Sequence, residues 1–200
     1  MCAKARHRSI IQISDFQVGG IYRSPDGSAR RILYYVMRFA SYGELHRLIK
    51  DSEMFTEKLA RIIFRKLILT IEHLHNSRIA HRDIKAENIL IDHRFNIQLV
   101  DFGCASYFLD HEHNKIDLDS SEPVGTLKTN APELTNNLEK GTYHGDEIDL
   151  FACGCVLFEM VIKAEPFKST DHTDKNYGEL AKGNFNAFWN IFSALCKPSS

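Results

Sequence analysis

One short run of the chain gathers the residue types that phosphoryl transfer requires. The run reads His81-Arg82-Asp83-Ile84-Lys85-Ala86-Glu87-Asn88, and Asp101-Phe102-Gly103 follows it. A phosphoryl transfer site needs a carboxylate that orients the attacking hydroxyl, a cation at the transferring phosphate, and oxygen ligands for Mg²⁺. Asp83, Lys85, Asn88 and Asp101 are residues of these types. Either motif alone is typical of a surface turn, so the hypothesis depends on their occurring together.

The two motifs together resemble the signature of the protein kinase family. The resemblance implies that Asp83 accepts or orients the proton of the substrate hydroxyl, and that Lys85 neutralises the transferring phosphate. It also implies that Asn88 and Asp101 hold Mg²⁺, with ATP as phosphoryl donor and a protein as substrate. Kinases for serine and threonine resemble the form with a lysine where Lys85 stands, so the resemblance favours Ser/Thr substrates.

A second stretch, from Gly125 to Glu133, resembles the substrate-binding segment of the same family, which ends in Ala-Pro-Glu. The resemblance implies that Thr126 hydrogen-bonds to the 81–88 loop. In the family, an arginine of the last helices pairs with the glutamate at the position of Glu133, but no residue after Ala194 supplies it, so Glu133 is expected to lack this partner. Asp149 stands where family members anchor the backbone of that loop, although a carboxylate early in a helix is also favoured by the helix dipole alone. Phe102 resembles a member of a stacked hydrophobic spine that includes His81.

The nucleotide-binding residues that the resemblance implies lie earlier in the chain. Met37 falls at the gatekeeper position, and Phe39 and Ala40 belong to the hinge whose backbone binds adenine. Glu44 matches a ribose contact, with a solvated acid at a helix start as the alternative. Leu90 would pack beneath adenine, which is compatible with its being an ordinary core leucine.

The resemblance also suggests a regulatory pair. Arg82 directly precedes Asp83, an arrangement that in this family receives a phosphate from the activation loop. We hypothesise that phosphorylated Ser121, or Glu122 as a built-in acid, pairs with Arg82 and orders the loop. The alternative is a flexible acidic loop with no switch.

The elements expected to position these residues begin with an antiparallel β-hairpin, from strands at 9–18 and 32–39 joined by the turn Ser24-Pro25-Asp26-Gly27. A short helix is expected from Gly43 to Lys50, and a long one after an N-cap at Thr56 that ends near Asn76-Ser77. Further expectations are a hairpin of 89–91 and 97–100, an unstructured polar loop at 104–127, a buried helix at 146–164 and an amphipathic helix at 177–194.

These elements predict an α+β fold that is protein-kinase-like, with a mainly helical large lobe preceded by a remnant β-hairpin of the small lobe. We expect residues 1–200 to form one partial kinase domain. Residues 1–39 would be the remnant of the small lobe and hinge, and residues 40–200 the large lobe.

The composition excludes some classes of partner. Lys and Arg number 25 against 26 Asp and Glu, so no net field attracts nucleic acid or an anionic membrane. The five cysteines are odd in number and form no CxxC pair, which favours a reducing compartment: the cytoplasm, with the nucleus as the alternative. No signal peptide or transmembrane segment is expected. The sequence does not indicate an oligomeric state.

Two other groups of residues suggest chemistry less strongly. His111 and His113 have the spacing of metal ligands on a strand, but without a third cluster a mobile loop is the favoured interpretation. Cys153 and Cys155 lie two residues apart on an apolar helix and do not face one another, so they are interpreted as buried thiols.

Two functions compete, because no glycine-rich loop and no phosphate-binding lysine precede the first predicted strand. The first is a Ser/Thr protein kinase represented by an incomplete chain, which we expect to be inactive alone. The second is a non-catalytic, kinase-like module that binds a protein partner. The four intact groups at 83, 85, 88 and 101 favour the first.

Overall fold

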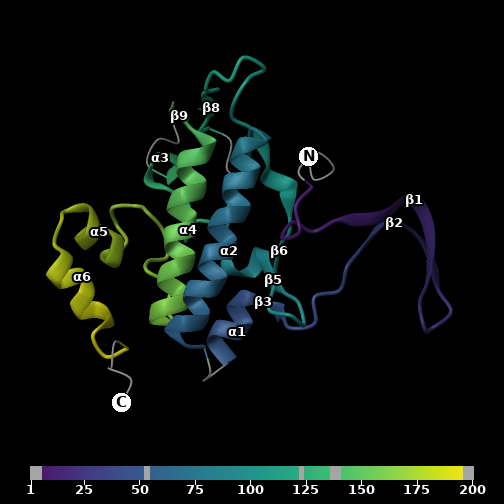
Figure 1. Ribbon diagram of the computed structural model, residues 1–200, viewed down its shortest axis with the longest axis horizontal. Helices are drawn as coiled ribbons and strands as arrows, with labels where there is room; N and C mark the ends of the chain where they lie inside the picture. The colour runs from purple at the N-terminus through teal and green to yellow at the C-terminus, as the bar shows by residue number, and fades with distance from the viewer. Residues whose placement is uncertain (1–5, 52–54, 122–123, 136–140, 196–200) are drawn as a thin grey trace.

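The computed structural model describes residues 6–51, 55–121, 124–135 and 141–195. A body built mainly of helices carries several very short strand pairs, and one long β-hairpin projects from it (Figure 1). The predicted α+β class is therefore confirmed. Within the described ranges, no helix combines the length and the apolar character needed to cross a membrane.

The projecting hairpin consists of β1 (Ile13–Arg23) and β2 (Ala29–Met37), paired antiparallel as predicted. Its turn closes with hydrogen bonds from Gly27 N to Ser24 O (3.0 Å) and from Ser24 N to Ser28 O (2.9 Å). The strand bounds differ from the prediction of 9–18 and 32–39. Ile10 forms a parallel bridge to Leu99 of the body instead of joining the hairpin. A register shift between Val18 and Gly20 then lets β1 continue to Arg23.

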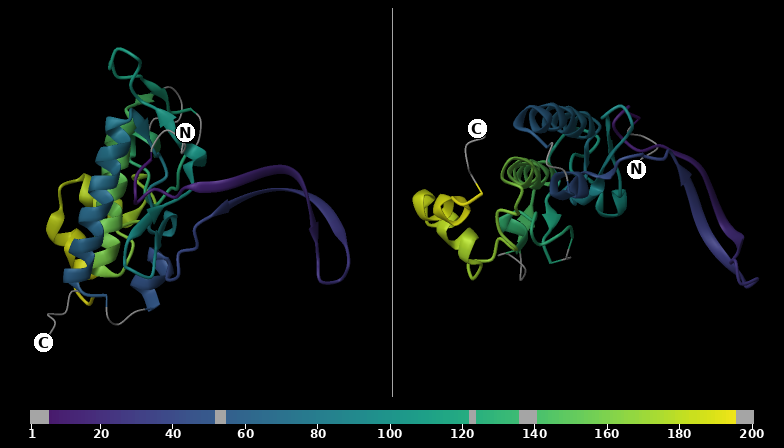
Figure 2. Two further views of the ribbon diagram at one scale, coloured as in Figure 1. Left: turned by 45° about the vertical axis from the view of Figure 1, so that its right-hand side comes forward. Right: turned by 90° about the horizontal axis from the view of Figure 1, so that it is seen from below.

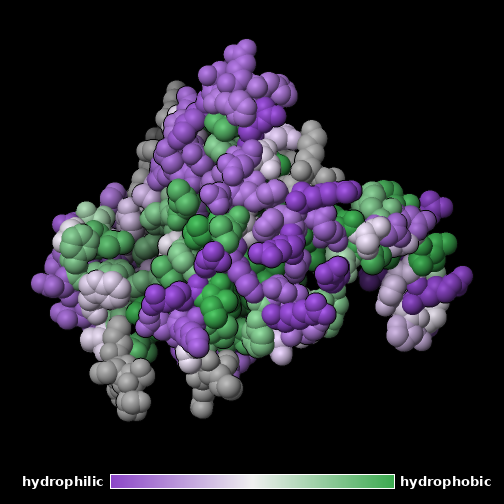
Figure 3. Space-filling view, in the orientation of Figure 1, coloured by the Kyte–Doolittle hydropathy of each residue, from purple (hydrophilic) through white to green (hydrophobic). Residues whose placement is uncertain are grey.

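Apolar side chains are exposed along this hairpin. The ribbon stands away from the helices in all three views (Figures 1 and 2), and Figure 3 shows hydrophobic residues on its surface. Those that are 45% to 71% exposed are Ile13, Phe16, Val18, Ile21, Leu33, Tyr35 and Val36. An apolar area of this kind on a strand pair marks a contact surface or an aggregation risk.

The helical body is organised around two long helices, α2 (Glu57–Asn76) and α4 (Gly145–Ile162). Thr56 caps α2 as predicted, since its side chain accepts from Leu59 N at 3.4 Å. The predicted end of α2 near Asn76-Ser77 is also confirmed. The short helix α1 (Leu45–Asp51) starts later than predicted, because Gly43 and Glu44 form a strand instead.

The core lies between α2 and α4. Apolar positions of α2 recur every three or four residues, which places them on one helical face. The side chains from the two helices that are at most 5% exposed include Ile63, Leu67, Ile71, Leu74, Ala152, Cys153, Val156 and Met160. Cys153 and Cys155 are both buried, as predicted. Burial raises the pKa of the Cys153 thiol and raises that of Cys155 to about 12, so both stay protonated.

Three short sheets connect segments of the body that are separated in the sequence. The first has the order β3 (Gly43–Glu44), β5 (Ile89–Ile91) and β6 (Ile97–Leu99), which confirms the predicted hairpin of 89–91 and 97–100. The second pairs β4 (Ile79–Ala80) with β7 (Ser106–Tyr107). The third pairs β8 (Leu118–Asp119) with β9 (Thr142–Tyr143).

Two predictions about the chain after residue 104 were wrong. The polar stretch 104–127 is not unstructured, because β7 and β8 tie it to the body through partners that are remote in sequence. The helix predicted at 177–194 is two helices, α5 (Lys175–Ala181) and α6 (Phe185–Phe192). Gly183 between them has a φ of +74°, which ends helical geometry, and Asn184 then caps α6 by accepting from Ala187 N.

Candidate active site

The 81–88 loop is suspended between β4 and β5. It leaves β4 at Ala80 and ends in a 3₁₀ helix, Ala86–Asn88. Val100 N donates to Asn88 O at 3.0 Å, which joins the loop to the residue before Asp101. The β4–β7 pairing brings the segment after Gly103 alongside the start of the loop. Both predicted motifs therefore meet in one place.

Asp83 is the centre of this place and is only 8% exposed. Its Oδ1 accepts from Thr126 Oγ1 at 2.7 Å, and its Oδ2 accepts from Lys85 Nζ at 2.8 Å. Asn88 Nδ2 donates to the same Oδ2 at 3.0 Å and to Asp83 O at 2.9 Å. The structure thus brings together four residues that the sequence predicted, and it fixes the carboxylate of Asp83 in one orientation.

Lys85 closes a ring of hydrogen bonds around this carboxylate. Its Nζ also donates to Thr126 Oγ1 at 2.8 Å, while Thr126 itself donates to Asp83. The lysine side chain is 20% exposed, so its positive charge remains accessible from one side. A cation and a carboxylate held side by side are the pair that a hydroxyl and an incoming phosphate require.

Asp149 of α4 holds the backbone of the 81–88 loop. The residue is 1% exposed. Its Oδ2 accepts from His81 N at 2.8 Å, and its Oδ1 accepts from Arg82 N at 2.8 Å. This is the contact that the family resemblance implied. Arg82 has a φ of 65°, a left-handed conformation that is unfavourable for a non-glycine residue, so these two hydrogen bonds stabilise a strained loop.

His81 joins the two motifs as a neutral ring. Its Nε2 lies 3.0 Å from Val100 O, and its Nδ1 accepts from Asp83 N at 3.3 Å. Because Nδ1 faces an N–H donor, the proton belongs on Nε2. Burial lowers the pKa of His81, an effect that the charge of Asp149 only partly offsets. The ring also packs edge-on against Phe102, with centroids 4.8 Å apart.

Asn88 and Asp101 have the donor atoms that Mg²⁺ prefers. The side-chain nitrogen of Asn88 is directed at Asp83, which leaves Oδ1 as the atom that can coordinate. Asp101 is exposed and takes a left-handed conformation with φ 59° and ψ 76°. Within the described part of the chain, the one hydrogen bond to its side chain runs from Gly103 N to Oδ1, at 3.2 Å. One carboxylate and one amide oxygen match a site that Mg²⁺ shares with phosphates and water.

The predicted nucleotide-binding residues are brought together in part. Glu44 and Leu90 are cross-strand partners in the β3–β5 pair. Ala40 is 7% exposed, and its carbonyl oxygen accepts from Gly43 N at 3.1 Å, so it lies next to that pair. Met37 ends β2 and is 40% exposed, whereas Phe39 is 83% exposed. Met37 is therefore the last residue of the hairpin, and Phe39 lies on the connection between the hairpin and the body.

The predicted regulatory residues Arg82, Ser121 and Glu133 lie in separate segments of the chain. Arg82 donates from Nε to Cys104 O and from Nη1 to the hydroxyl of Tyr143, both at 2.6 Å. Ser121 is exposed just beyond β8, and Glu122 lies outside the described residues. Glu133 belongs to the short helix α3 (Pro132–Thr135) and forms no ion pair with another described residue.

The structure adds residues that the sequence analysis missed. Tyr143 contacts Arg82, and His75 Nε2 lies 3.0 Å from Asp149 Oδ2. Lys128 Nζ reaches Glu87 Oε1 at 2.6 Å and Glu165 Oε1 at 2.8 Å. In the sequence, Lys128 is marked only by its place in the segment 125–133, which resembles the substrate-binding segment of the family.

The polar loop at 110–114 is stabilised by its own backbone. Asp110 Oδ1 accepts from Glu112 N and Asn114 N at 2.8 and 2.9 Å, which turns the carboxylate toward the loop. His111 and His113 are exposed. Among the residues that the structure describes, no group of three or more His, Cys, Asp and Glu side chains could hold a metal ion.

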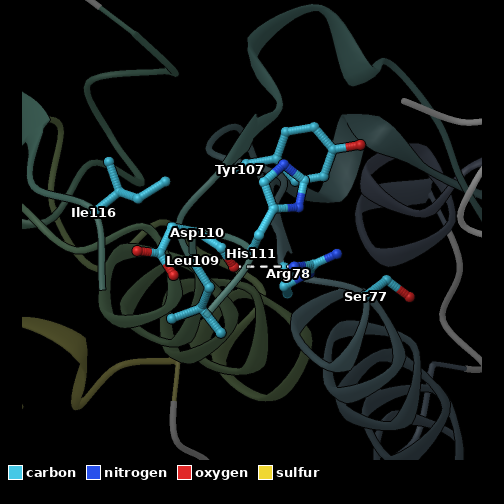
Figure 4. A pocket seen from close by; sticks show the side chains of 7 residues that line it. All are labelled: Ser77, Arg78, Tyr107, Leu109, Asp110, His111 and Ile116. Carbon is cyan, nitrogen blue, oxygen red and sulfur yellow. Dashed lines mark hydrogen bonds between the residues drawn. The ribbon is translucent and has the colours of Figure 1, made fainter. Parts of the chain in front are cut away.

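A cavity of about 600 Å³ lies beside this loop (Figure 4), and its lining comprises Ser77, Arg78, Tyr107, Leu109, Asp110, His111 and Ile116. Arg78 Nη1 donates to Asp110 O at 2.9 Å across it. None of the predicted site residues lines this cavity. The cavity therefore contributes nothing to the arrangement around Asp83.

Comparison with known proteins gives one family. Residues 1–195 match the family model described as "Protein kinase domain". Over 143 residues the chain is 35% identical to Serine/threonine-protein kinase PKH2 of Candida albicans, covering 70% of this chain and 15% of that protein.

Two further relatives agree. The chain is 34% identical over 147 residues to Serine/threonine-protein kinase PKH1 of Saccharomyces cerevisiae, covering 70% of this chain and 19% of the relative. It is 30% identical over 165 residues to Serine/threonine protein kinase OSK3 of Oryza sativa, covering 82% of this chain and 30% of the relative. The chain thus spans less than a third of the length of each of these relatives.

Proposed function

This chain belongs to the protein kinase family, and from that premise we propose that the protein transfers the terminal phosphoryl group of ATP to a serine or threonine hydroxyl of a protein substrate. The observation that carries the proposal is the buried carboxylate of Asp83, which Thr126, Lys85 and Asn88 hold from three directions. Phosphoryl transfer depends almost entirely on positioning and charge stabilisation, and this arrangement supplies both.

In this proposal, Asp83 orients the hydroxyl of the protein substrate and accepts its proton. Its two oxygens are already oriented by Thr126 and Lys85, so a substrate hydroxyl would meet a carboxylate that does not have to reorganise. As the acceptor oxygen bonds to phosphorus, the bond from phosphorus to the leaving oxygen breaks, and the hydroxyl proton passes to Asp83. Lys85 places its positive charge beside the same carboxylate, where the transferring phosphate carries negative charge.

Asn88 and Asp101 are assigned to Mg²⁺. Bound Mg²⁺ and ATP would supply charge neutralisation and the phosphoryl group, respectively. The exposed carboxylate of Asp101 and the free amide oxygen of Asn88 would hold the metal beside the 81–88 loop. Asp101 takes a left-handed conformation, and its side chain accepts a hydrogen bond from Gly103 N. Because the intervening Phe102 packs on His81, this segment is held against the 81–88 loop.

The adenine base would bind at the connection between the hairpin and the body, which follows β2. The pairing of Glu44 with Leu90 supports a ribose contact and an apolar surface at the same strand pair. Ala40 would present backbone groups to adenine, and Met37 and Phe39 precede it in the chain. A serine or threonine acceptor is supported by Lys85 and by the names of the relatives, which are all Ser/Thr kinases.

A second candidate function is a kinase-like module that holds a protein partner without transferring phosphate. The specific observation in its favour is the projecting hairpin, with apolar side chains such as Phe16 and Val18 exposed by 57% and 71%. Exposed apolar areas of this kind mark protein interaction sites.

One experiment separates the two candidates. The full-length protein, Asp83→Asn, and a control, Asp26→Asn in the exposed hairpin turn, are assayed for transfer of labelled phosphate from ATP and for ATP binding. We expect Asp83→Asn to lower kcat by about 10²- to 10⁴-fold while ATP affinity stays nearly unchanged. The control should behave as the unaltered protein. An unaltered protein that binds partners and transfers no phosphate would support the second candidate. An Asp83→Asn protein that is as active as the control would reject the role of Asp83.

A further inference from the structure

Lys128 ties together three segments that are remote in sequence. It lies in the segment 125–130, and its side chain is 16% exposed. Its Nζ donates to Glu87 Oε1 at 2.6 Å and to Glu165 Oε1 at 2.8 Å. Glu87 belongs to the 3₁₀ helix that ends the 81–88 loop, and Glu165 follows α4. One ammonium group therefore fastens the segment to the loop on one side and to the helical body on the other.

The ion pairs of Lys128 offset the effect of burial on the pKa of each partner. Burial lowers the pKa of Lys128, but the hydrogen bonds that it donates to Glu165 and Glu87, together with their charges, outweigh burial, so its pKa is raised overall. Burial raises the pKa of Glu87, but the hydrogen bond and charge of Lys128, a backbone hydrogen bond and the charge of His46 together outweigh burial, so the pKa is lowered. Oε2 of Glu87 is buried and has no partner among the described residues. Lys128 is therefore the ammonium group that contributes most to keeping this carboxylate ionised.

A second pair continues the network behind Glu87. His46 of α1 lies 2.6 Å from Glu159 Oε1 of α4 and 4.0 Å from Glu87 Oε1, both measured from Nδ1. Glu159 is 6% exposed, and burial raises its pKa although the bond to His46 opposes the shift. His46 therefore already has a closer acid than Glu87. The cluster contains three carboxylates, and no second lysine or arginine among the described residues pairs with them.

The position of Lys128 in the chain links this network to Asp83. Thr126, two residues earlier, donates to Asp83 Oδ1. Thr129 N and Asn130 N both donate to Thr126 O at 2.9 Å, so residues 126–130 form one tight turn. Asn130 Nδ2 also donates to Val124 O at 3.0 Å. A turn this closed moves as a unit, so fixing the side chain of Lys128 fixes the hydroxyl of Thr126 as well.

We infer that Lys128 is a positioning residue for the phosphoryl transfer proposed above, acting through the turn to hold Thr126 against Asp83. The inference deepens the proposed function and rests on it for its kinetic consequence. Its structural part, that Lys128 anchors the turn, stands independently. Replacing Lys128 leaves the half-buried carboxylate of Glu87 without its ammonium partner, which a neutral side chain at position 128 cannot replace.

The first measurement is hydrogen exchange of the backbone amides of Thr129 and Asn130, which needs no activity. In the full-length protein we expect Lys128→Met to raise their exchange rates about tenfold or more, because the turn opens locally. Lys128→Arg keeps the charge and should restore protection. The matched control is Lys115→Met, since Lys115 also bridges two carboxylates, Asp146 and Glu147, but does so at the surface with 45% exposure.

The second measurement is the kinetics of phosphate transfer with the same variants. We expect Lys128→Met to lower kcat with protein substrate about 10- to 100-fold, because small misplacements at a reacting centre are costly. The KM for ATP should not change, and Lys128→Arg should recover most of kcat. A purely structural role would instead lower the melting temperature, and would lower ATP affinity together with kcat.

The outcomes separate the inference from the proposed function. If the unaltered protein transfers no phosphate, the proposed function fails, and amide exchange still decides whether Lys128 anchors the turn. Exchange at Thr129 and Asn130 that is unchanged in Lys128→Met, or raised equally in Lys115→Met, would overturn the anchoring. Raised exchange with unchanged kcat would overturn the positioning role. The double variant Glu87→Gln with Lys128→Met removes the unpaired charge. If the double variant regains both protection and kcat, the effect belongs to the stranded Glu87 and the inference is wrong.

Discussion

The hydroxyl of Thr126 donates to Oδ1 of Asp83 across 2.7 Å, although the two residues are 43 positions apart in the sequence. The same hydroxyl oxygen accepts from Lys85 Nζ at 2.8 Å. One small side chain therefore connects the segment that follows the activation loop with the carboxylate and the cation of the 81–88 loop. Its two hydrogen bonds give the first prediction.

Thr126→Val removes both hydrogen bonds and keeps the shape of the side chain. A hydrogen bond to a charged group contributes about 1.5–3 kcal/mol, so we expect kcat with protein substrate to fall about 10- to 100-fold. Thr126→Ser retains the hydroxyl and should stay within about threefold of the unaltered protein. Steady-state kinetics of the full-length protein check both values. Equal rates for the valine and serine variants would show that the hydroxyl has no role.

Asp149→Asn tests the anchoring of the 81–88 loop. The amide cannot accept from His81 N, Arg82 N and His75 Nε2 as the carboxylate does, and its NH₂ group faces a donor. We expect the free energy of unfolding to fall by about 2–4 kcal/mol. Urea denaturation measures it. Asp146→Asn in the first turn of α4 is the control, because its side chain is 24% exposed, and it should lose less than about 1 kcal/mol. Similar losses in both variants would contradict the anchoring.

The neutral ring of His81 predicts a pH dependence of stability. The folded-state pKa of His81 is lowered by burial relative to about 6.5 in the unfolded chain, so the unfolded state binds more protons. The contribution of the neutral His81 ring to the free energy of unfolding is therefore fully present above about pH 6.5, and it is lost as the pH falls below that value. The slope for one proton is at most about 1.4 kcal/mol per pH unit.

The variant that checks this is His81→Phe, compared with the unaltered protein by urea denaturation between pH 7.5 and pH 5. The variant should be less stable at pH 7.5, because the bonds to Val100 and Asp83 are absent, and its stability should fall less steeply toward acid. His93→Phe, at an exposed position, should leave the slope unchanged. An acid slope that is the same with and without His81 would sink the prediction.

Gly125→Ala should be strongly destabilising. Gly125 has a φ of +71°, and a Cβ there would lie 2.5 Å from Asn130 Oδ1 and 2.7 Å from the backbone oxygen of Arg82. Gly183 has a similar φ of +74° but faces open space, so Gly183→Ala isolates the cost of the backbone conformation. We expect losses of about 1–2 kcal/mol at position 183 and about 2–4 kcal/mol at position 125. Chemical denaturation compares them, and equal losses would refute the steric argument.

Phosphorylation of Ser121 is the last prediction. Ser121 is exposed, while its neighbour Ser120 is buried and donates to Gly141 O at 2.8 Å, so Ser121 is the accessible hydroxyl. A phosphate at Ser121 would compete with Cys104 O and Tyr143 for the guanidinium of Arg82. We expect Ser121→Ala to lower the activity of the phosphorylated full-length protein about tenfold, by loss of charge-assisted hydrogen bonds. Mapping of the phosphorylated residues and kinetics of phosphate transfer test this prediction. If Ser121→Ala transfers phosphate at the unaltered rate, the alternative of a flexible loop with no switch is supported.

Local signals in the sequence predicted the parts of the fold that local physics determines. The N-cap at Thr56 and the spacing of apolar residues in α2 depend on neighbours within one or two turns, and both were confirmed. The hairpin was also predicted, but its register was not, because the bulge at Val18–Gly20 and the bridge from Ile10 to Leu99 depend on partners elsewhere. The break between α5 and α6 was missed although Gly183 signals it, because the apolar residues on both sides keep helical spacing.

The candidate site divides in the same way. The run at 81–88 and the motif at 101–103 identified Asp83, Lys85, Asn88 and Asp101 through resemblance. The contacts of Arg82 with Tyr143 and of Lys128 with Glu165 were not predictable, because each joins residues about 40 to 60 positions apart whose types are common on surfaces. Only a three-dimensional arrangement distinguishes such a lysine from a solvated one.

The projecting hairpin has a consequence for every stability measurement described above. Its strands pair with each other, and β1 and β2 stand away from the helical body (Figure 2). The single tryptophan, Trp189, belongs to α6 and stacks on Phe158 of α4 with ring centroids 5.7 Å apart. Figure 1 shows α6 on the side of the body opposite the hairpin. Fluorescence therefore follows the cooperative loss of the helices and does not register whether the hairpin is open. We expect hydrogen exchange to find the hairpin amides opening in a separate, less costly transition, so that free energies of unfolding followed by tryptophan fluorescence report the helical body alone.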